Sequence, residues 1–139
     1  MKKLPELLAP AGSLECLKAA VCGGADAVYF GVPQFNARMK AKNFTPDELE
    51  QAFELCVLYG VKTNVTLNTL LYGREFAPAL DVVAGLEEKY RPDAYIVQDL
   101  GLAREMKKRF PDIVLHASTQ AEVHNAFGLE PFVRLGFSR

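Results

Sequence analysis

The stretch Ala94-Tyr95-Ile96-Val97-Gln98-Asp99, "AYIVQD", decides the fold that we expect for this chain. It is a short apolar run that ends abruptly in an amide and an acid. The run at residues 27–31, "AVYFG", has the same apolar character. Near-continuous apolar strings of this length are typical of parallel strands that are buried on both faces. Both runs therefore predict strands of a parallel sheet.

Five apolar runs of this kind recur along the chain, at residues 6–9, 27–31, 61–67, 94–97 and 113–117, and a helical pattern follows each of them. Strands that alternate regularly with helices predict an α/β protein with a parallel sheet and right-handed crossovers.

The helix after the second run has the clearest boundaries. Thr45-Pro46-Asp47-Glu48 supplies a capping residue, a proline at the first helical position and a glutamate that closes a capping box. Gly60 marks the end of this helix. The first helix is expected from about Leu14 to Gly23-Gly24, the third over residues 75–89, and the fourth from about Leu102.

The fifth unit is less regular than the others. Thr119 and Glu122 have the spacing of a capping box, and Pro131 is expected to kink or end the helix near Glu130. Gly136 has the place of a C-cap glycine, and the chain stops where a sixth strand would begin.

Two architectures are compatible with five β/α units. One is a TIM-like (β/α)8 barrel, of which five units are the N-terminal part, and the other is a five-stranded flavodoxin-like open sheet. The tail after Gly136 favours the barrel, because its last three residues have no evident place in a completed sheet. We therefore expect residues 1–139 to be a single domain, a partial barrel truncated before strand six.

The composition indicates a compact domain and names no partner. Half of the 139 residues are apolar, and 16 basic side chains balance 17 acidic ones, so no net charge draws the chain to nucleic acid or to a membrane. Pro5 and Pro10 interrupt the first apolar run, which predicts no signal peptide or membrane span and a cytoplasmic protein. The three cysteines have no C-x-x-C spacing, which favours buried free thiols over a metal site.

Polar side chains end the predicted strands, where both architectures place their ligands. Asp99 has a second interpretation as a helix N-cap, and Asn68 has one as a turn residue. Residues 9–13 are small, so backbone amides at the next helix could approach an anion; a tight turn with Ser13 as N-cap is the alternative. The polar strand-end residues are Asn68, Gln98, Asp99, Ser118 and Gln120.

The loop "GVPQFNARMKAKNF" at residues 31–44 carries Arg38, Lys40, Lys42 and Asn43 between two phenylalanines. An arginine there could fork onto a carboxylate or phosphate. The alternative is a solvated basic loop anchored by the two aromatic rings. His116 lies on the fifth strand. The sequence contains no recognisable pair of a nucleophile and a base and no recognisable set of metal ligands, so the catalytic residues stay unassigned.

Five segments, in this order and with these gaps, together resemble the N-terminal region of the collagenase-like peptidase family U32. They are "ELLAPAGSLECLKAAVCGGADAVYFG", "FNARMKAKNF", "VTLNTLL", "AYIVQDLG" and "LHASTQAEVHN". The resemblance implies a TIM-like barrel for the whole protein. It also implies either a protease of the collagen-degrading kind or a protein of RNA or quinone hydroxylation without molecular oxygen.

Hydroxylating members of this family look like iron-sulfur proteins whose cluster cysteines lie beyond the matched region. The resemblance therefore implies no cofactor in this piece, an iron-sulfur cluster in the full-length protein, and no activity for the piece alone. The resemblance assigns no catalytic residue, because members of the family have no agreed catalytic residue in their N-terminal half. The matched motifs contain Glu6, Pro10, Gly12, Tyr29, Arg38, Asn43, Asn68, Gln98, Asp99, Ser118, Gln120 and Asn125.

The leading hypothesis is a cytoplasmic enzyme whose barrel mouth binds an anionic small molecule, a peptide or RNA. The competing class is a non-catalytic flavodoxin-like binding module. A partial barrel is also expected to self-associate through its exposed strand edge. The expected substrate-binding residues are Arg38, Asn43, Asn68, Gln98, Asp99, Ser118, Gln120 and Asn125.

Overall fold

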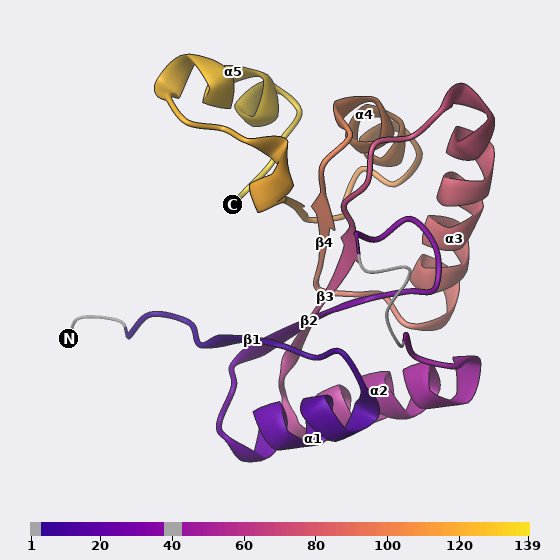
Figure 1. The fold of residues 1–139 in the computed structure, drawn as a ribbon, viewed down its shortest axis with the longest axis vertical. Coiled ribbons are helices and arrows are strands. Elements are labelled where there is room, and N and C mark those ends of the chain that lie inside the picture. The colour runs from indigo at the N-terminus through magenta and orange to yellow at the C-terminus, as the bar shows by residue number, and fades with distance from the viewer. Residues whose placement is uncertain (1–3, 38–42) are drawn as a thin grey trace.

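The computed structural model describes residues 4–37 and 43–139 and shows one five-stranded parallel sheet with helices packed beside it (Figure 1). The strands lie within two residues of the apolar runs that predicted them. They are β1 (Leu8–Pro10), β2 (Ala27–Gly31), β3 (Lys62–Leu67), β4 (Ala94–Val97) and β5 (Leu115–Ala117).

The strand order decides between the two expected architectures. Each strand pairs with the next one along the chain, which gives the order β1-β2-β3-β4-β5 with every pair parallel. A flavodoxin-like sheet has the order 2-1-3-4-5, with its first strand inside the sheet. The flavodoxin-like alternative is therefore wrong. A consecutive order is that of a TIM-like barrel, here as an open sheet.

Five α-helices follow the five strands, and the best predicted of them is α2. Thr45 Oγ1 accepts from the Glu48 amide (3.2 Å), and a Glu48 carboxylate oxygen accepts from the Thr45 amide (2.9 Å), which confirms the capping box. Gly60 ends the helix with φ +67°, a conformation that favours glycine. The helices are α1 (Leu14–Cys22), α2 (Pro46–Tyr59), α3 (Phe76–Lys89), α4 (Leu100–Arg109) and α5 (Ala126–Arg134).

Helix α5 departs from its prediction in two ways. Residues Thr119–Ala121 form a short 3-10 turn and Glu122 has φ +53°, so the expected capping box of Thr119 and Glu122 is wrong. Asn125 caps the helix instead. The helix also continues through Pro131. The carbonyl that Pro131 leaves without its helical donor belongs to Phe127, which is 89% exposed, so water can reach this turn.

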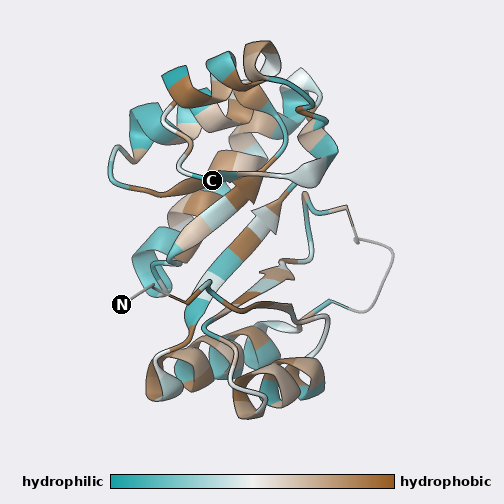
Figure 2. Ribbon diagram, turned by 90° about the vertical axis from the view of Figure 1, so that its left-hand side faces the viewer, coloured by the Kyte–Doolittle hydropathy of each residue, from teal (hydrophilic) through white to brown (hydrophobic). Residues whose placement is uncertain are grey.

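The strand register separates the side chains into two faces. Phe30, Val65, Tyr95 and Leu115 occupy one register row, and all four are buried. Every strand residue of the hydrophobic core shares this face, which the helices cover. Figure 2 shows the brown apolar segments along the strands. We call the opposite face the inner face; Gly31, Thr66, Ile96 and His116 form one of its register rows.

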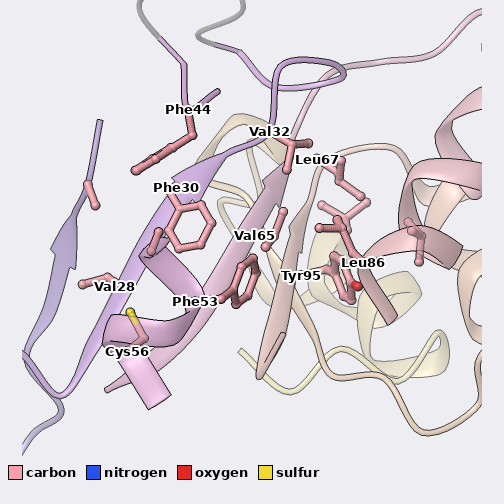
Figure 3. Close-up of a cluster of buried hydrophobic side chains, with 14 of the residues drawn as sticks. Val28, Phe30, Val32, Phe44, Phe53, Cys56, Val65, Leu67, Leu86 and Tyr95 are labelled. Carbon is pink, nitrogen blue, oxygen red and sulfur yellow. The ribbon is translucent and has the colours of Figure 1, made fainter. Parts of the chain in front are cut away.

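Aromatic rings fill the core between β2 and α2. Phe30 lies 5.3 Å from Phe44 and 5.4 Å from Phe53 between ring centroids, and Figure 3 shows the three rings grouped together. Phe53 stacks on Tyr90 at 4.3 Å. Phe44 follows the basic loop and is 3% exposed. This burial agrees, at Phe44, with the alternative interpretation of a loop that aromatic rings anchor.

Charged groups from distant parts of the chain meet at the inner face. Glu6 precedes β1, Lys62 begins β3, and Arg139 follows β5. The Glu6 carboxylate contacts Lys62 Nζ and the Arg139 guanidinium, both at 2.8 Å. Both cations lower the pKa of Glu6. A contact between the two edges of a five-stranded sheet requires the sheet to be strongly curved, as in a barrel.

Residues 137–139 pair with β5. Phe137 forms a parallel bridge with Leu115, whose carbonyl accepts from the Ser138 amide at 2.9 Å. The Ala117 amide donates to the Arg139 carbonyl at 2.7 Å. The three residues that the sequence left without a place thus lie where the first residues of a sixth barrel strand belong.

His116 on the inner face is expected to make the stability of the fold depend on pH. His116 Nδ1 is buried and has no hydrogen-bond partner in the described part of the chain. Burial lowers the pKa of His116, the Arg139 guanidinium and Lys62 lower it further, and Glu6 opposes this. The unfolded chain therefore takes up the proton first, at its ordinary pKa of about 6.5.

We expect the free energy of unfolding to fall as the pH is lowered from about 7.5 to about 5.5. Urea denaturation across this range measures it. His116→Asn should flatten the dependence, and His124→Asn, which removes the other histidine at an exposed position, serves as the control. An equally steep dependence in His116→Asn would contradict the assignment to His116.

Candidate functional site

A pocket of about 480 Å³ lies at the carboxyl ends of β1, β2 and β3. Loops after β1 and β2 and the turn after β5 complete its walls. Its described lining contains amides, hydroxyls, one thiol and three aromatic rings, and no charged side chain. The lining residues are Pro10, Ala11, Gly12, Ser13, Cys16, Tyr29, Phe30, Gly31, Asn36, Ala37, Asn43, Phe44, Thr66, Asn68, Thr119 and Gln120.

The expected site residue Asn68 joins two walls of the pocket. Its Oδ1 accepts from the Ala37 amide at 3.1 Å, and its Nδ2 lies 3.5 Å from Ser118 Oγ. The side chain therefore holds the loop after β2 against the end of β5. Both hydrogen-bonding ends of the amide are engaged within the chain, so Asn68 positions other pocket residues whether or not it also contacts a ligand.

Ser118, Gln120 and Gln98 form a connected group beside Asn68. Ser118 Oγ accepts from the Gln120 amide at 3.2 Å, and Gln98 Nε2 donates to the Gln120 carbonyl at 3.0 Å. Gln120 lines the pocket, whereas Gln98 and Ser118 support it from behind. The structure thus brings together four residues that the sequence places on three separate strand ends.

Two other expected residues serve as helix caps. Asp99 Oδ1 accepts from the Leu102 amide at 2.9 Å, and its Oδ2 accepts from the Leu71 amide at 3.2 Å. Asn125 Oδ1 accepts from the Gly128 amide at 2.9 Å. Neither residue belongs to the pocket lining. Their substrate-binding role stays a prediction, and their structural role is the one that the geometry explains.

The basic loop is only partly described. Arg38, Lys40 and Lys42 lie outside the described residues, and Asn43, which follows them, lines the pocket. Phe35 precedes them, half-buried and at φ +60°. A bulky residue in the left-handed region is strained, so packing of the Phe35 ring against the core must hold this conformation.

Sequence reasoning missed Asn36, the most deeply buried amide of the pocket, which is 2% exposed. Its Nδ2 donates to the Val32 carbonyl and lies 3.5 Å from Asn43 Oδ1. A Cβ added at Gly31 would lie 2.6 Å from the Asn36 side chain. The sequence signal that could have revealed Asn36 is Gly31 at the end of an apolar strand, because a glycine there marks the close approach of another group.

The cysteines do not provide a cluster site. Cys56 is buried on α2, and burial raises the pKa of its thiol to about 11. Cys16 and Cys22 are exposed on α1, so the interpretation as buried thiols is wrong for these two. An iron-sulfur cluster usually takes four cysteine ligands. No group of three His, Cys, Asp or Glu residues within 4–37 and 43–139 could hold a metal ion, so these residues do not fit such a cluster.

The family model described as peptidase family U32 matches residues 12–139, which include nearly the whole pocket lining. The chain belongs to this family. The U32 resemblance of the five sequence segments is therefore confirmed, and it extends through α5, where the sequence pattern was least regular.

Relatives of this U32 chain have two kinds of name. A collagenase of Porphyromonas gingivalis is 37% identical over 130 residues, which are 93% of this chain and 31% of that protein. The 23S rRNA 5-hydroxycytidine C2501 synthase of Escherichia coli is 37% identical over 134 residues, 96% of this chain and 20% of that protein. The tRNA hydroxylation protein P1 of Bacillus subtilis is 37% identical over 123 residues, 88% and 29% respectively.

The chain thus spans about a third or less of the length of these relatives. A solved structure, that of the U32 peptidase Mk0906, superimposes with a TM-score of 0.81 at 17% identity, over 99% of this chain and 57% of that one. This likeness supports the fold, the TIM-like barrel of a U32 protein. Among the described residues, no helix has the length and apolar character to cross a bilayer.

The close approach of Asn36 to Gly31 predicts a large effect of one methyl group. Gly31→Ala should lower the free energy of unfolding by about 1–3 kcal/mol, because the added Cβ overlaps the Asn36 side chain. Chemical denaturation measures the loss. Gly85→Ala is the matched control, since a Cβ there meets nothing within 4 Å and an alanine in helix α3 should stabilise slightly.

A double variant tests the cause of the loss. If the clash is with Asn36, Gly31→Ala should cost less in an Asn36→Ala background than in the original chain. Equal costs in both backgrounds would contradict this explanation.

Proposed function

We propose that this U32 chain forms the substrate-binding mouth of an enzyme, with the pocket at the carboxyl ends of β1–β3 as its binding site. The observation that carries the proposal is the convergence of Asn36, Asn43, Asn68 and Gln120 on one pocket at the edge where barrel enzymes act. Carboxamides both donate and accept hydrogen bonds, so they suit the orientation of a polar substrate.

The proposed ligand is an anionic small molecule, a peptide or an RNA segment, and Arg38 acts as its anion clamp. The support for the clamp is the position of its neighbours. Ala37 and Asn43, the residues on either side of the undescribed segment, both line the pocket. The described lining has no charged group that would compete with an arginine for the anion.

For the reaction we propose oxygen-independent RNA hydroxylation, with peptide hydrolysis as the second candidate. The RNA-hydroxylation names of two relatives support the first candidate, and the collagenase name of a third supports the other. Hydroxylation of a quinone ring is a further alternative within the same class. We also propose a cytoplasmic location, an iron-sulfur cluster elsewhere in the intact gene product, and self-association of this chain through its exposed strand edge.

Removal of the clamp should reduce catalysis. In the intact gene product, Arg38→Ala should lower kcat/KM by about one to two orders of magnitude, because hydrogen bonds to charged groups contribute about 1.5–3 kcal/mol. Steady-state kinetics measures the effect, with the substrate of whichever of the two candidate reactions the intact protein catalyses. Arg104→Ala removes an exposed arginine on α4 and is the control. Unchanged turnover and affinity in Arg38→Ala would remove Arg38 from the site.

The two reactions differ in their requirements. If the protein hydroxylates RNA, the intact gene product purified without oxygen should contain iron and sulfide, and RNA from a deletion strain should lack a hydroxylated pyrimidine that the gene restores. Metal analysis and mass spectrometry of the RNA measure both. Cleavage of denatured collagen by protein without iron and sulfide would instead establish the peptidase.

A further inference from the structure

The turn that leads into α1 and the first residues of this helix have four successive backbone amides for which the described residues supply no acceptor. They belong to Gly12, Ser13, Leu14 and Glu15. The Ser13 hydroxyl oxygen accepts a hydrogen bond from the following amide, that of Cys16, at 3.2 Å. The amides of Ser13, Leu14 and Glu15 belong to the start of the helix, point along its axis and carry the positive end of its dipole, and the Gly12 amide directly precedes them; an anion or water must satisfy them.

This helix terminus borders the pocket. Gly12 and Ser13 line the pocket, and a Cβ added at Gly12 would meet nothing within 4 Å. No acidic side chain belongs to the described lining. Glu15, the acidic residue of the first turn, is exposed and is not part of that lining. Space and electrostatics at Gly12 and Ser13 therefore both suit an oxyanion.

A second polar group in the same pocket also lacks a partner. Thr66 is only 8% exposed, lies on the inner face of β3 and lines the pocket. Its hydroxyl makes no hydrogen bond to any described residue, and it is not among the fully enclosed unpaired atoms. The hydroxyl of this largely buried residue is therefore open to the pocket, where an oxygen of a ligand can hydrogen-bond with it.

We propose that the pocket binds a small ligand by two of its oxygen-bearing groups. A carboxylate or phosphate rests on the amides at the start of α1, and a second oxygen of the same molecule hydrogen-bonds with the Thr66 hydroxyl. A pocket of about 480 Å³ is of the size that holds a small molecule. The proposal specifies the ligand class of the site under Proposed function and rests on that site, but it needs neither Arg38 nor either reaction.

Titration of the 15N-labelled chain with two probes tests the proposal. Glycolate offers a carboxylate with one hydroxyl, and glycerol phosphate offers a phosphate with hydroxyls, so the two distinguish the sources of the oxyanion. At least one of them should cause saturable shifts of the Gly12 and Ser13 amide resonances. No saturable shift with either probe would overturn the proposal.

Variants separate the two contacts. Thr66→Val should weaken binding of the active probe about two- to tenfold, as expected for one hydrogen bond. Gly12→Ala should weaken binding by placing a methyl group beside the amides, whereas Gly85→Ala should leave the affinity unchanged. Unchanged affinity in Thr66→Val would overturn the Thr66 contact.

Arg38→Ala distinguishes this inference from the proposed clamp. The amide shifts should persist in that variant if α1 binds the oxyanion by itself. Their loss would show that the anion belongs to Arg38 and would overturn the α1 subsite. Persistent shifts together with unchanged catalysis in the intact Arg38→Ala protein would instead remove the clamp and keep the subsite.

Discussion

The parallel register of the five strands is the constraint on which the rest of the structure depends. Side chains alternate along a strand, so the row of Phe30, Val65, Tyr95 and Leu115 fixes the face of every other strand residue. The helices cover the apolar face, and the polar residues Thr66 and Asn68 are left on the inner face. A slip of one residue in any strand would exchange the two faces and destroy both the core and the pocket.

The parts of this fold that depend on local sequence could be predicted, and those that depend on distant contacts could not. Apolar runs located the strands, and Thr45 with Glu48 located α2, because those signals act within a few residues. The cap of α5 was assigned to Thr119 although Asn125 supplies it, since several polar residues in that stretch can cap a helix. The Glu6–Arg139 contact joins the two ends of the chain and has no local signal.

The pocket was predicted as a location more successfully than as a list of residues. The rule that ligands bind beyond the carboxyl ends of the strands placed Asn43, Asn68 and Gln120 in one lining. It also selected Asp99, because a polar residue after a strand has the same appearance in sequence whether it caps the next helix or faces a ligand. Asn125, another helix cap, was selected through the family resemblance. Asn36 escaped attention because only its contact with the glycine before the loop reveals its burial.

The ion pair between Glu6 and Arg139 has a consequence for the order of folding. Each strand pairs with the next one in sequence, so each pairing closes a much shorter loop than the ion pair does and costs less loop entropy. The ion pair spans almost the whole length of the chain and can form only after the sheet has curved. It is therefore a late event of folding, and a probe at either residue would report completion of the curved sheet rather than formation of its individual units.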